Sequence, residues 1–318
     1  MHQFNEHHPE FKGFSAFYNS EILPSLERDE LTRLSVMGKV KKVIPAVVVT
    51  TLIALGIAIY FRAPFVVYAV LTVFGVTIGM GAWTQLMKTV RSNIKENIVG
   101  NLCRFLGFAF QSEMAVSPRL EQFITLGLVT KSYDRSNFED QISGTAHGAK
   151  FLLHEAHLEN REGTGKNRRW VTKFRGQLLV IEFYQKFLGR TIVLRDKGWL
   201  QGKKKDDMKR VGLVDPVFEK IFEAYGTDQV EARYLLTPTF MQRLVDLENS
   251  VDGKNIRFGF DGGNLYIAVE TGNRYEPGSM FKPLTETERT QTVLDEIGAI
   301  FDVIDGVLKR PEARPARV

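Results

Sequence analysis

Cysteine is nearly absent from this chain, which has Cys103 as the single cysteine among 318 residues. One cysteine excludes an intrachain disulfide and a paired-cysteine zinc motif, and it fits a reducing compartment. The HExxH and GxSxG patterns are also absent, as is a spaced glycine motif between a strand and a helix. The net charge of +5 is too modest to suggest nucleic-acid binding. The sequence motifs therefore indicate no particular reaction and no cofactor.

Charge is absent from two long apolar runs near the amino terminus. Residues 43–61 and 65–83 carry no charged side chain, and only the segment 62–64 separates them. At about 1.5 Å of rise per residue, each run makes a helix of roughly 28 Å, close to the hydrocarbon thickness of a bilayer. The sequence therefore predicts a two-helix transmembrane hairpin over residues 43–84. The alternative is a buried helical hairpin of a soluble protein.

The charges that flank the hairpin indicate its orientation. The turn holds one cation, Arg62. Several cations lie just outside the two runs, namely Lys39, Lys41, Lys42, Lys88, Arg91 and Lys95. Because positively charged flanks stay in the cytoplasm, both termini are expected in the cytosol. The polar, acidic amino terminus is not a signal peptide, so the first run is expected to act as an uncleaved membrane signal.

Helical spacing continues on both sides of the hairpin. Residues 1–42 are expected to form a cytosolic amphipathic helical segment, which Pro24 kinks or divides. Apolar residues after the hairpin recur at helical steps as far as Ala109, which predicts a helical stalk and linker over residues 85–130. A short helix is expected there over residues 119–129, with Ser117 as its cap and Pro118 at its first position. The two extensions should pack as an antiparallel pair; the alternative is that the first lies flat in the membrane interface.

From about residue 140 the apolar period becomes strand-like. Residues 218–225 fit either a strand or a helix. Strands are expected at 151–157, 170–174, 177–183, 191–194, 256–260 and 264–269, and helices at 238–250 and 285–308. The sequence therefore predicts a cytosolic α+β domain over residues 131–309, with a mostly antiparallel sheet and a C-terminal helix. The basic tail, residues 310–318, is expected to be disordered.

Several segments resemble the bacterial DUF3137 family. Residues 144–159 (GTAHGAKFLLHEAHLE) look like the start of that family's core, and the FRG of 174–176 precedes an apolar strand as it does there. Residues 228–238 (DQVEARYLLTP) resemble the most recognisable block of the family. An FY pair at 17–18, followed by ILP before a helical hairpin, also fits. Because the function of the family is unknown, the resemblance implies a bacterial inner-membrane setting and transfers no catalytic residue.

Three histidines and a glycine-rich turn are the candidate ligand sites. His147, His154 and His157 are close in sequence, but in a strand His154 and His157 point to opposite faces, so no metal site is predicted. Residues 163–166 lack the first glycine and the following hydroxyl residue of a phosphate loop, so a hairpin turn is expected. No cofactor and no metal are predicted.

Carboxylates supply the remaining candidates for chemistry. Asp228, Glu231 and Arg233 form the sharpest polar cluster, because in an extended chain Glu231 and Arg233 would share one face and bind a polar ligand. The alternative is an ion pair that orders the entry to the helix at residue 238. Glu155 and Glu159 are expected on one strand face, where they either perform acid–base chemistry or face solvent.

Basic and small residues suggest two further contact surfaces. Lys203, Lys204 and Lys205 lie in a basic loop over residues 195–210, which either contacts anionic lipid or is simply solvated. A second surface joins the two apolar runs through small residues at four-residue spacing: Gly75, Gly79, Ala54 and Ala58. Small residues let helices approach closely, so this surface serves packing within the hairpin or self-association into a homo-oligomer.

Location and the absence of catalytic motifs together favour an interaction role. The sequence predicts a multi-pass scaffold of the bacterial inner membrane, with both termini cytosolic, that binds an unidentified protein partner and no nucleic acid. One alternative is a membrane-tethered hydrolase that uses Glu155, Asp228 or Glu231. Another is an oligomeric pore or transport accessory, although neither apolar run carries an ionisable residue that an ion pathway would need.

Overall fold

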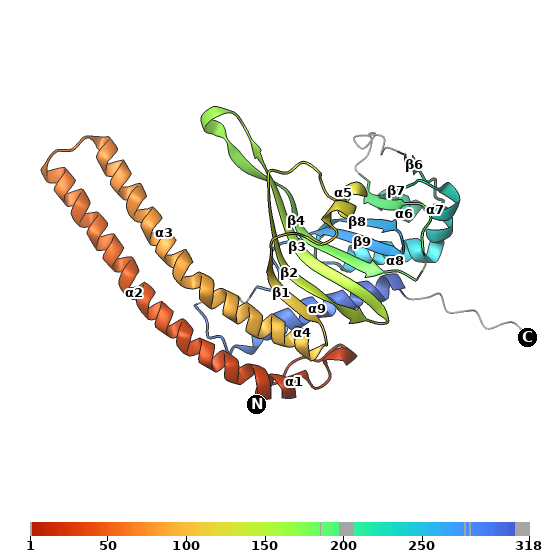
Figure 1. The fold of residues 1–318 in the computed structure, drawn as a ribbon, viewed down its shortest axis with the longest axis horizontal. Coiled ribbons are helices and arrows are strands. Elements are labelled where there is room, and N and C mark those ends of the chain that lie inside the picture. The colour runs from red at the N-terminus through yellow and green to blue at the C-terminus, as the bar shows by residue number, and fades with distance from the viewer. Residues whose placement is uncertain (1, 185, 197–206, 277, 280, 309–318) are drawn as a thin grey trace, which may run out of the picture. The chain divides into compact units, whose positions relative to one another are not determined.

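The computed structural model describes residues 2–184, 186–196, 207–276, 278–279 and 281–308 (Figure 1). The chain divides into two compact units. The helical unit comprises Met1–Phe105 and Glu276–Val293, and the sheet unit comprises Leu106–Tyr275 and Leu294–Val318. The final helix contributes its first residues to the helical unit and the remainder to the sheet unit.

Two long helices dominate the helical unit. Its elements in chain order are a 3-10 turn (Pro9–Phe11), α1 (Phe14–Phe17), a π turn (Tyr18–Ile22), α2 (Leu23–Tyr60), α3 (Phe65–Lys95), a second π turn (Glu96–Gly100) and α4 (Asn101–Phe105). Proline lacks an N–H, and its ring crowds the carbonyl four residues earlier. At Pro24 that carbonyl lies within the first π turn, where the backbone is wider. The helix therefore continues from the π turn into α2, and Pro24 widens it locally without dividing it in two.

The apolar stripes on either side of the hairpin pack against each other. Phe14 meets Phe105 with ring centroids 5.5 Å apart, and the Asn97 amide donates to the Asp29 carboxylate. Residues of both stripes are fully buried, namely Phe11, Phe14, Tyr18, Ile22, Leu26, Ile94, Ile98 and Leu102. This pairing agrees with the antiparallel arrangement predicted for the two extensions. The stalk itself is shorter than predicted, because α4 ends at Phe105 and a strand begins at Ala109.

A single antiparallel sheet forms the second unit. In the described residues its nine strands have the order β1-β2-β3-β4-β9-β8-β5-β7-β6, and each pair is antiparallel. The strands are β1 (Ala109–Met114), β2 (Arg135–Ala146), β3 (Ala149–Glu162), β4 (Arg169–Glu182), β5 (Thr191–Arg195), β6 (Lys209–Arg210), β7 (Phe222–Gly226), β8 (Lys254–Asp261) and β9 (Asn264–Glu270). The predicted mostly antiparallel sheet is confirmed.

Helices flank this sheet. They are α5 (Leu120–Thr125), α6 (Pro216–Ile221), α7 (Gln229–Leu235), α8 (Pro238–Ser250) and α9 (Thr287–Leu308). The predicted helix at 238–250 is confirmed, and the Thr237 hydroxyl caps it by accepting from the Phe240 N–H at 3.3 Å. The ambiguous segment 218–225 divides between α6 and β7. The two strands expected at 170–183 are one strand, β4, which runs through Gly176.

The helix predicted after Ser117 is shorter than expected and lacks the predicted serine cap. Arg119, with a left-handed backbone at φ 63°, occupies the capping position of α5. The Ser117 hydroxyl instead lies 2.6 Å from Nε2 of His154 on β3. One core cluster of the sheet unit lies between the sheet and α5, where Phe123, Leu178 and Tyr266 are buried together.

Candidate functional site

The two long helices carry a largely exposed apolar surface. Within the apolar stretches of α2 and α3, 6% and 0% of the residues are buried. Leu52 on α2 and Val73 on α3 are 61% and 65% exposed. By length and composition, each helix is able to cross a membrane. A continuous exposed apolar surface along two long helices indicates contact with lipid or with another protein.

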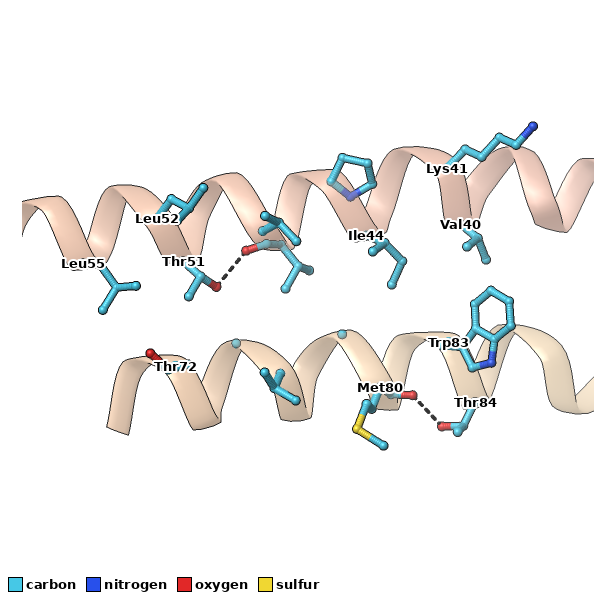
Figure 2. A pocket seen from close by; sticks show the side chains of 16 residues that line it. Val40, Lys41, Ile44, Thr51, Leu52, Leu55, Thr72, Met80, Trp83 and Thr84 are labelled. Carbon is cyan, nitrogen blue, oxygen red and sulfur yellow. Dashed lines mark hydrogen bonds between the residues drawn. The ribbon is translucent and has the colours of Figure 1, made fainter. Parts of the chain in front are cut away.

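Close approach of α2 and α3 depends on Gly75. A Cβ atom added at Gly75 would overlap the Thr51 hydroxyl and lie 2.8 Å from Thr51 Cγ2. The Thr51 hydroxyl donates to the Val47 carbonyl at 2.8 Å, within its own helix (Figure 2). A Cβ added at Gly79 would lie 4.0 Å from Val47 Cγ1. The two glycines therefore face Thr51 and Val47, and Gly75 allows the close approach of the two helices.

The two alanines proposed as the matching surface lie elsewhere along α2. Ala58 is buried near the turn, where its carbonyl accepts from the Tyr68 hydroxyl at 3.2 Å. Ala54 is partly buried. Beside the glycine contact an apolar groove of about 750 Å³ opens between the helices. Figure 2 shows Val40, Ile44 and Leu55 directed from α2 toward α3 in this groove. Self-association through the remaining helix surface stays a prediction.

A buried charge cluster fastens the segment before α9 to α2. The Glu30 carboxylate accepts from the Arg33 guanidinium at 2.6 and 2.8 Å and from the Leu284 N–H at 3.0 Å. The Arg33 hydrogen bond holds the pKa of Glu30 below its ordinary value. Arg289 donates to the Ser279 carbonyl at 2.8 Å, and burial lowers its pKa. Sequence analysis missed this cluster because its partners lie far apart in the chain.

The Asp228–Arg233 cluster has a helical geometry. Because residues 229–235 form α7, the expected extended arrangement that placed Glu231 beside Arg233 is wrong. Asp228 caps α7, and its carboxylate accepts from the N–H groups of Val230 and Glu231 at 2.8 and 3.0 Å. This cap satisfies N–H groups that the first turn of a helix leaves open, and it overrides the extended conformation.

Glu231 and Arg233 point to different surroundings. The Glu231 carboxylate accepts from the N–H groups of Leu188 and Gly189 at 2.9 and 2.7 Å, so it holds the loop that leads into β5. Arg233 is exposed to solvent. The structure therefore gives Asp228 and Glu231 structural partners, and their binding of a ligand stays a prediction.

Removing the charge of Glu231 is expected to destabilise the sheet unit. In Glu231→Gln the two backbone N–H groups lose a charged acceptor, which should cost about 1–2 kcal/mol of unfolding free energy. Arg233→Gln is the matched control and should change that energy by less than about 0.5 kcal/mol. Denaturant unfolding of the detergent-solubilised chain measures both. Equal stability of the two variants would contradict the structural role of Glu231.

The three histidines lie in separate surroundings. His147 pairs with Asp305 of α9, His154 is fully buried, and Nε2 of the partly buried His157 lies 3.0 Å from the Thr172 hydroxyl. Burial lowers the pKa of His154 to about 4. Among the described residues, no group of three or more histidine, cysteine or acidic side chains is arranged to hold a metal ion.

The two β3 carboxylates have separate roles in the sheet. Glu155 is buried and accepts from the Arg274 N–H at 2.9 Å. Glu159 pairs with Arg135 of β2, and the hydrogen bond from that guanidinium lowers its pKa. Neither contact by itself brings the two carboxylates together as an acid–base pair.

Two further predictions concern loops. Residues 163–167 form the predicted hairpin turn, which joins β3 to β4 and includes a 3-10 turn at Gly165–Asn167. The candidate lipid-contact residues Lys203, Lys204 and Lys205 lie outside the described residues. Their contact with lipid stays a prediction.

Comparison with known proteins supports the resemblance found in the sequence. A family model described as "Protein of unknown function (DUF3137)" matches residues 172–309, which confirms the predicted resemblance. A comparison with curated proteins gives no match. Among solved structures, the chain is similar to the mycobacterial trehalose monomycolate transport factor A, TtfA, with 10% identity and a TM-score of 0.35. That match covers 69% of this chain and 98% of the other, and at this TM-score it carries no argument about function.

Proposed function

We propose that this chain, whose residues 172–309 match the DUF3137 family model, is a membrane-anchored interaction protein. In this proposal residues 43–61 and 65–83 cross the bacterial inner membrane as a hairpin, and the sheet unit binds a protein partner in the cytosol. The observation that carries the membrane anchor is the uncovered apolar surface of α2 and α3. Contact of this apolar surface with water is unfavourable, whereas contact with lipid acyl chains is not.

Charge and aromatic residues support the proposed orientation. Cations lie at the ends of the apolar runs that lead to the termini, whereas the turn holds only Arg62. Cytoplasmic flanks carry such an excess of lysine and arginine. Tyr60 near the turn is 83% exposed, and Trp83 lies at the opposite end of the hairpin. Tyrosine and tryptophan favour the membrane–water interface, so these rings fit its two sides.

The surface around α7 supports the interaction role. Val230 and Tyr234 are one helical turn apart on α7, and they are 78% and 72% exposed. Leu188 is fully exposed and is held beside α7, because its N–H donates to the Glu231 carboxylate. Large apolar side chains that gather on a surface favour a protein partner with an apolar patch of its own. We call Leu188, Val230 and Tyr234 the α7 patch.

A pull-down of the intact chain in mild detergent tests the interaction role. A protein that co-purifies with the parent chain should be lost from Val230→Ser/Tyr234→Ser, because interface residues of this kind contribute about 1–2 kcal/mol or more each. Val214→Ser/Val217→Ser is the matched control, since these valines are also exposed. It should retain the partner. Loss from both variants, or from neither, would contradict a partner bound at the α7 patch.

The hydrolase alternative receives no support from the contacts of its candidate residues. Glu155 accepts from the Arg274 N–H, whereas Asp228 and Glu231 accept from N–H groups of α7 and of residues 188–189. Each carboxylate thus holds backbone, and these hydrogen bonds explain its position in the fold. We therefore favour the interaction role.

A further inference from the structure

The hairpin formed by β3 and β4 is longer than the sheet that carries it. The pairing of β2 with β3 reaches as far as Glu159, and the pairing of β9 with β4 begins at Gly176. The pairing of β3 with β4 continues beyond both, to Glu162 opposite Arg169. Residues 160–171 therefore form a two-stranded ribbon, which projects past the other strands (Figure 1). We call this ribbon the arm.

Cations on the arm outnumber the anions that could neutralise them. Arg161, Arg168 and Arg169 are exposed, and none of them forms an ion pair with another described residue. The acidic side chain of the arm, Glu162, is already paired with Lys173. The arm therefore presents guanidinium groups whose hydrogen-bond donors are open to a partner.

An exposed tryptophan lies among these arginines. Trp170 is 42% exposed, and the Arg135 guanidinium lies 4.0 Å from the centroid of its ring. Arg161 is directly opposite Trp170 in the strand register and lies 6.0 Å from the same ring. Because side chains two positions apart in extended chain share a face, Arg168 joins them. We call Arg135, Arg161, Arg168 and Trp170 the Trp170 face.

The Trp170 face combines two chemistries that suit one kind of surface. A guanidinium forms paired hydrogen bonds to a phosphate and stacks on an aromatic ring. An indole favours the interface between water and a bilayer. A two-stranded ribbon is marginally stable alone, so contact with a surface would also stabilise the arm. Anionic phospholipid offers phosphate groups at such an interface.

We propose that the Trp170 face binds phosphate headgroups of anionic phospholipids at the membrane surface. The proposal rests on the proposed function, because the hairpin of α2 and α3 would tether the sheet unit within reach of the bilayer. Tethering makes the contact intramolecular, so weak attraction at each cation is sufficient. Each unpaired cation near an anionic leaflet strengthens binding about five-fold, so Arg161 and Arg168 together contribute on the order of thirtyfold. Arg135 already pairs with Glu159 and adds less.

Fluorescence of Trp170 tests the proposal in the full-length chain. The chain has three tryptophans, and the double variant Trp83→Phe/Trp199→Phe retains Trp170 alone. The chain is reconstituted in nanodiscs of phosphatidylcholine, with or without phosphatidylglycerol that carries bromine on its acyl chains near the headgroup. Quenching by bromine and protection from iodide are expected only with phosphatidylglycerol. Exposure of Trp170 to iodide in both lipids would overturn the proposal.

Charge variants separate the Trp170 face from general attraction. Arg135→Gln/Arg161→Gln/Arg168→Gln should abolish bromine quenching and keep the thermal midpoint of the parent. The control removes the same number of charges from exposed lysines elsewhere on the sheet unit. It is Lys150→Gln/Lys186→Gln/Lys220→Gln, and it should be quenched like the parent. Equal loss in both triple variants would overturn the proposal.

Two further readouts identify the partner and separate the two proposals. A single-stranded RNA added to phosphatidylcholine nanodiscs should leave Trp170 unchanged; a larger response to RNA than to phosphatidylglycerol would overturn the lipid proposal. Retention of the chain in carbonate-washed membranes tests the membrane anchor independently of the arm. Retention with an iodide-exposed Trp170 contradicts only the arm proposal. Release from membranes, with Trp170 still protected by added phosphatidylglycerol vesicles, contradicts only the anchor.

Discussion

Replacing Gly176 with alanine is expected to destabilise the sheet unit strongly. Gly176 has φ +157°, and a Cβ atom added there would overlap the Val269 carbonyl oxygen. The same atom would lie 2.8 Å from both the Glu270 Cα and the Thr271 backbone nitrogen. These are backbone atoms of β9 and the residue that follows it, in the register Gly176 opposite Glu270. Relief would therefore require β4 and β9 to separate.

The expected cost is large relative to the stability of a domain. Overpacking and backbone strain together should remove on the order of 3–5 kcal/mol, out of the roughly 5–15 kcal/mol that a domain has. The thermal midpoint and the yield of the detergent-solubilised Gly176→Ala chain measure this loss. Gly272→Ala is the matched control, because a Cβ there has no neighbour within 4 Å. A Gly176→Ala midpoint within about 2 °C of the parent would contradict the argument.

Acid is expected to destabilise the sheet unit through His154. The side chain is fully buried, its Nε2 lies 2.6 Å from the Ser117 hydroxyl, and burial lowers its pKa from 6.5 to about 4. The unfolded chain therefore takes up a proton at higher pH than the folded chain does. The stability that the neutral ring provides is complete above about pH 6.5 and falls as the pH drops to about 4.

The pH dependence separates His154 from other titrating groups. The shift corresponds to a loss of about 3 kcal/mol of unfolding free energy across that interval. Denaturant unfolding at several pH values should show this loss in the parent and in His157→Gln, whose side chain is only partly buried. His154→Gln should be less stable near neutral pH but should lose correspondingly less on acidification. The same acid-dependent loss in His154→Gln and the parent would disprove the role of this histidine.

Local signals predicted several elements of the fold well. The start of α8 follows from Thr237 and Pro238, which supply a cap and a pre-set φ angle. The β8–β9 hairpin follows from Asp261, Gly262 and Gly263, because this turn needs glycine and a short loop. In both cases the residues that decide the structure are adjacent in sequence.

Other features depend on contacts that a sequence pattern does not contain. The apolar spacing up to Ala109 fits a helix, yet Ala109–Met114 pairs with β2 and forms β1. Helical spacing and strand alternation are hard to separate in so short a segment. Glu231 was expected in extended chain because the capping role of Asp228 was not recognised. The missed cap accounts for the main error in the candidate site.

The arm was also missed, for a related reason. The turn at 163–167 was predicted, but the length of the ribbon depends on where β2 and β9 stop pairing. The contact of Arg135 with Trp170 joins residues of two strands that only the sheet register brings together. Gly176 is a different case. The sequence places it in the recognised FRG segment, but only the structure explains why glycine is needed there, which is the close approach of β9.

Labelling of single cysteines in intact cells tests the bilayer-spanning hairpin most directly. Cys103→Ala removes the native cysteine, after which Ala63→Cys places one in the turn between α2 and α3, and Asn167→Cys places one in the arm. A membrane-impermeant maleimide should label position 63 in intact cells and position 167 only after the inner membrane is opened. A chain whose position 63 is protected until the cells are opened would contradict the account.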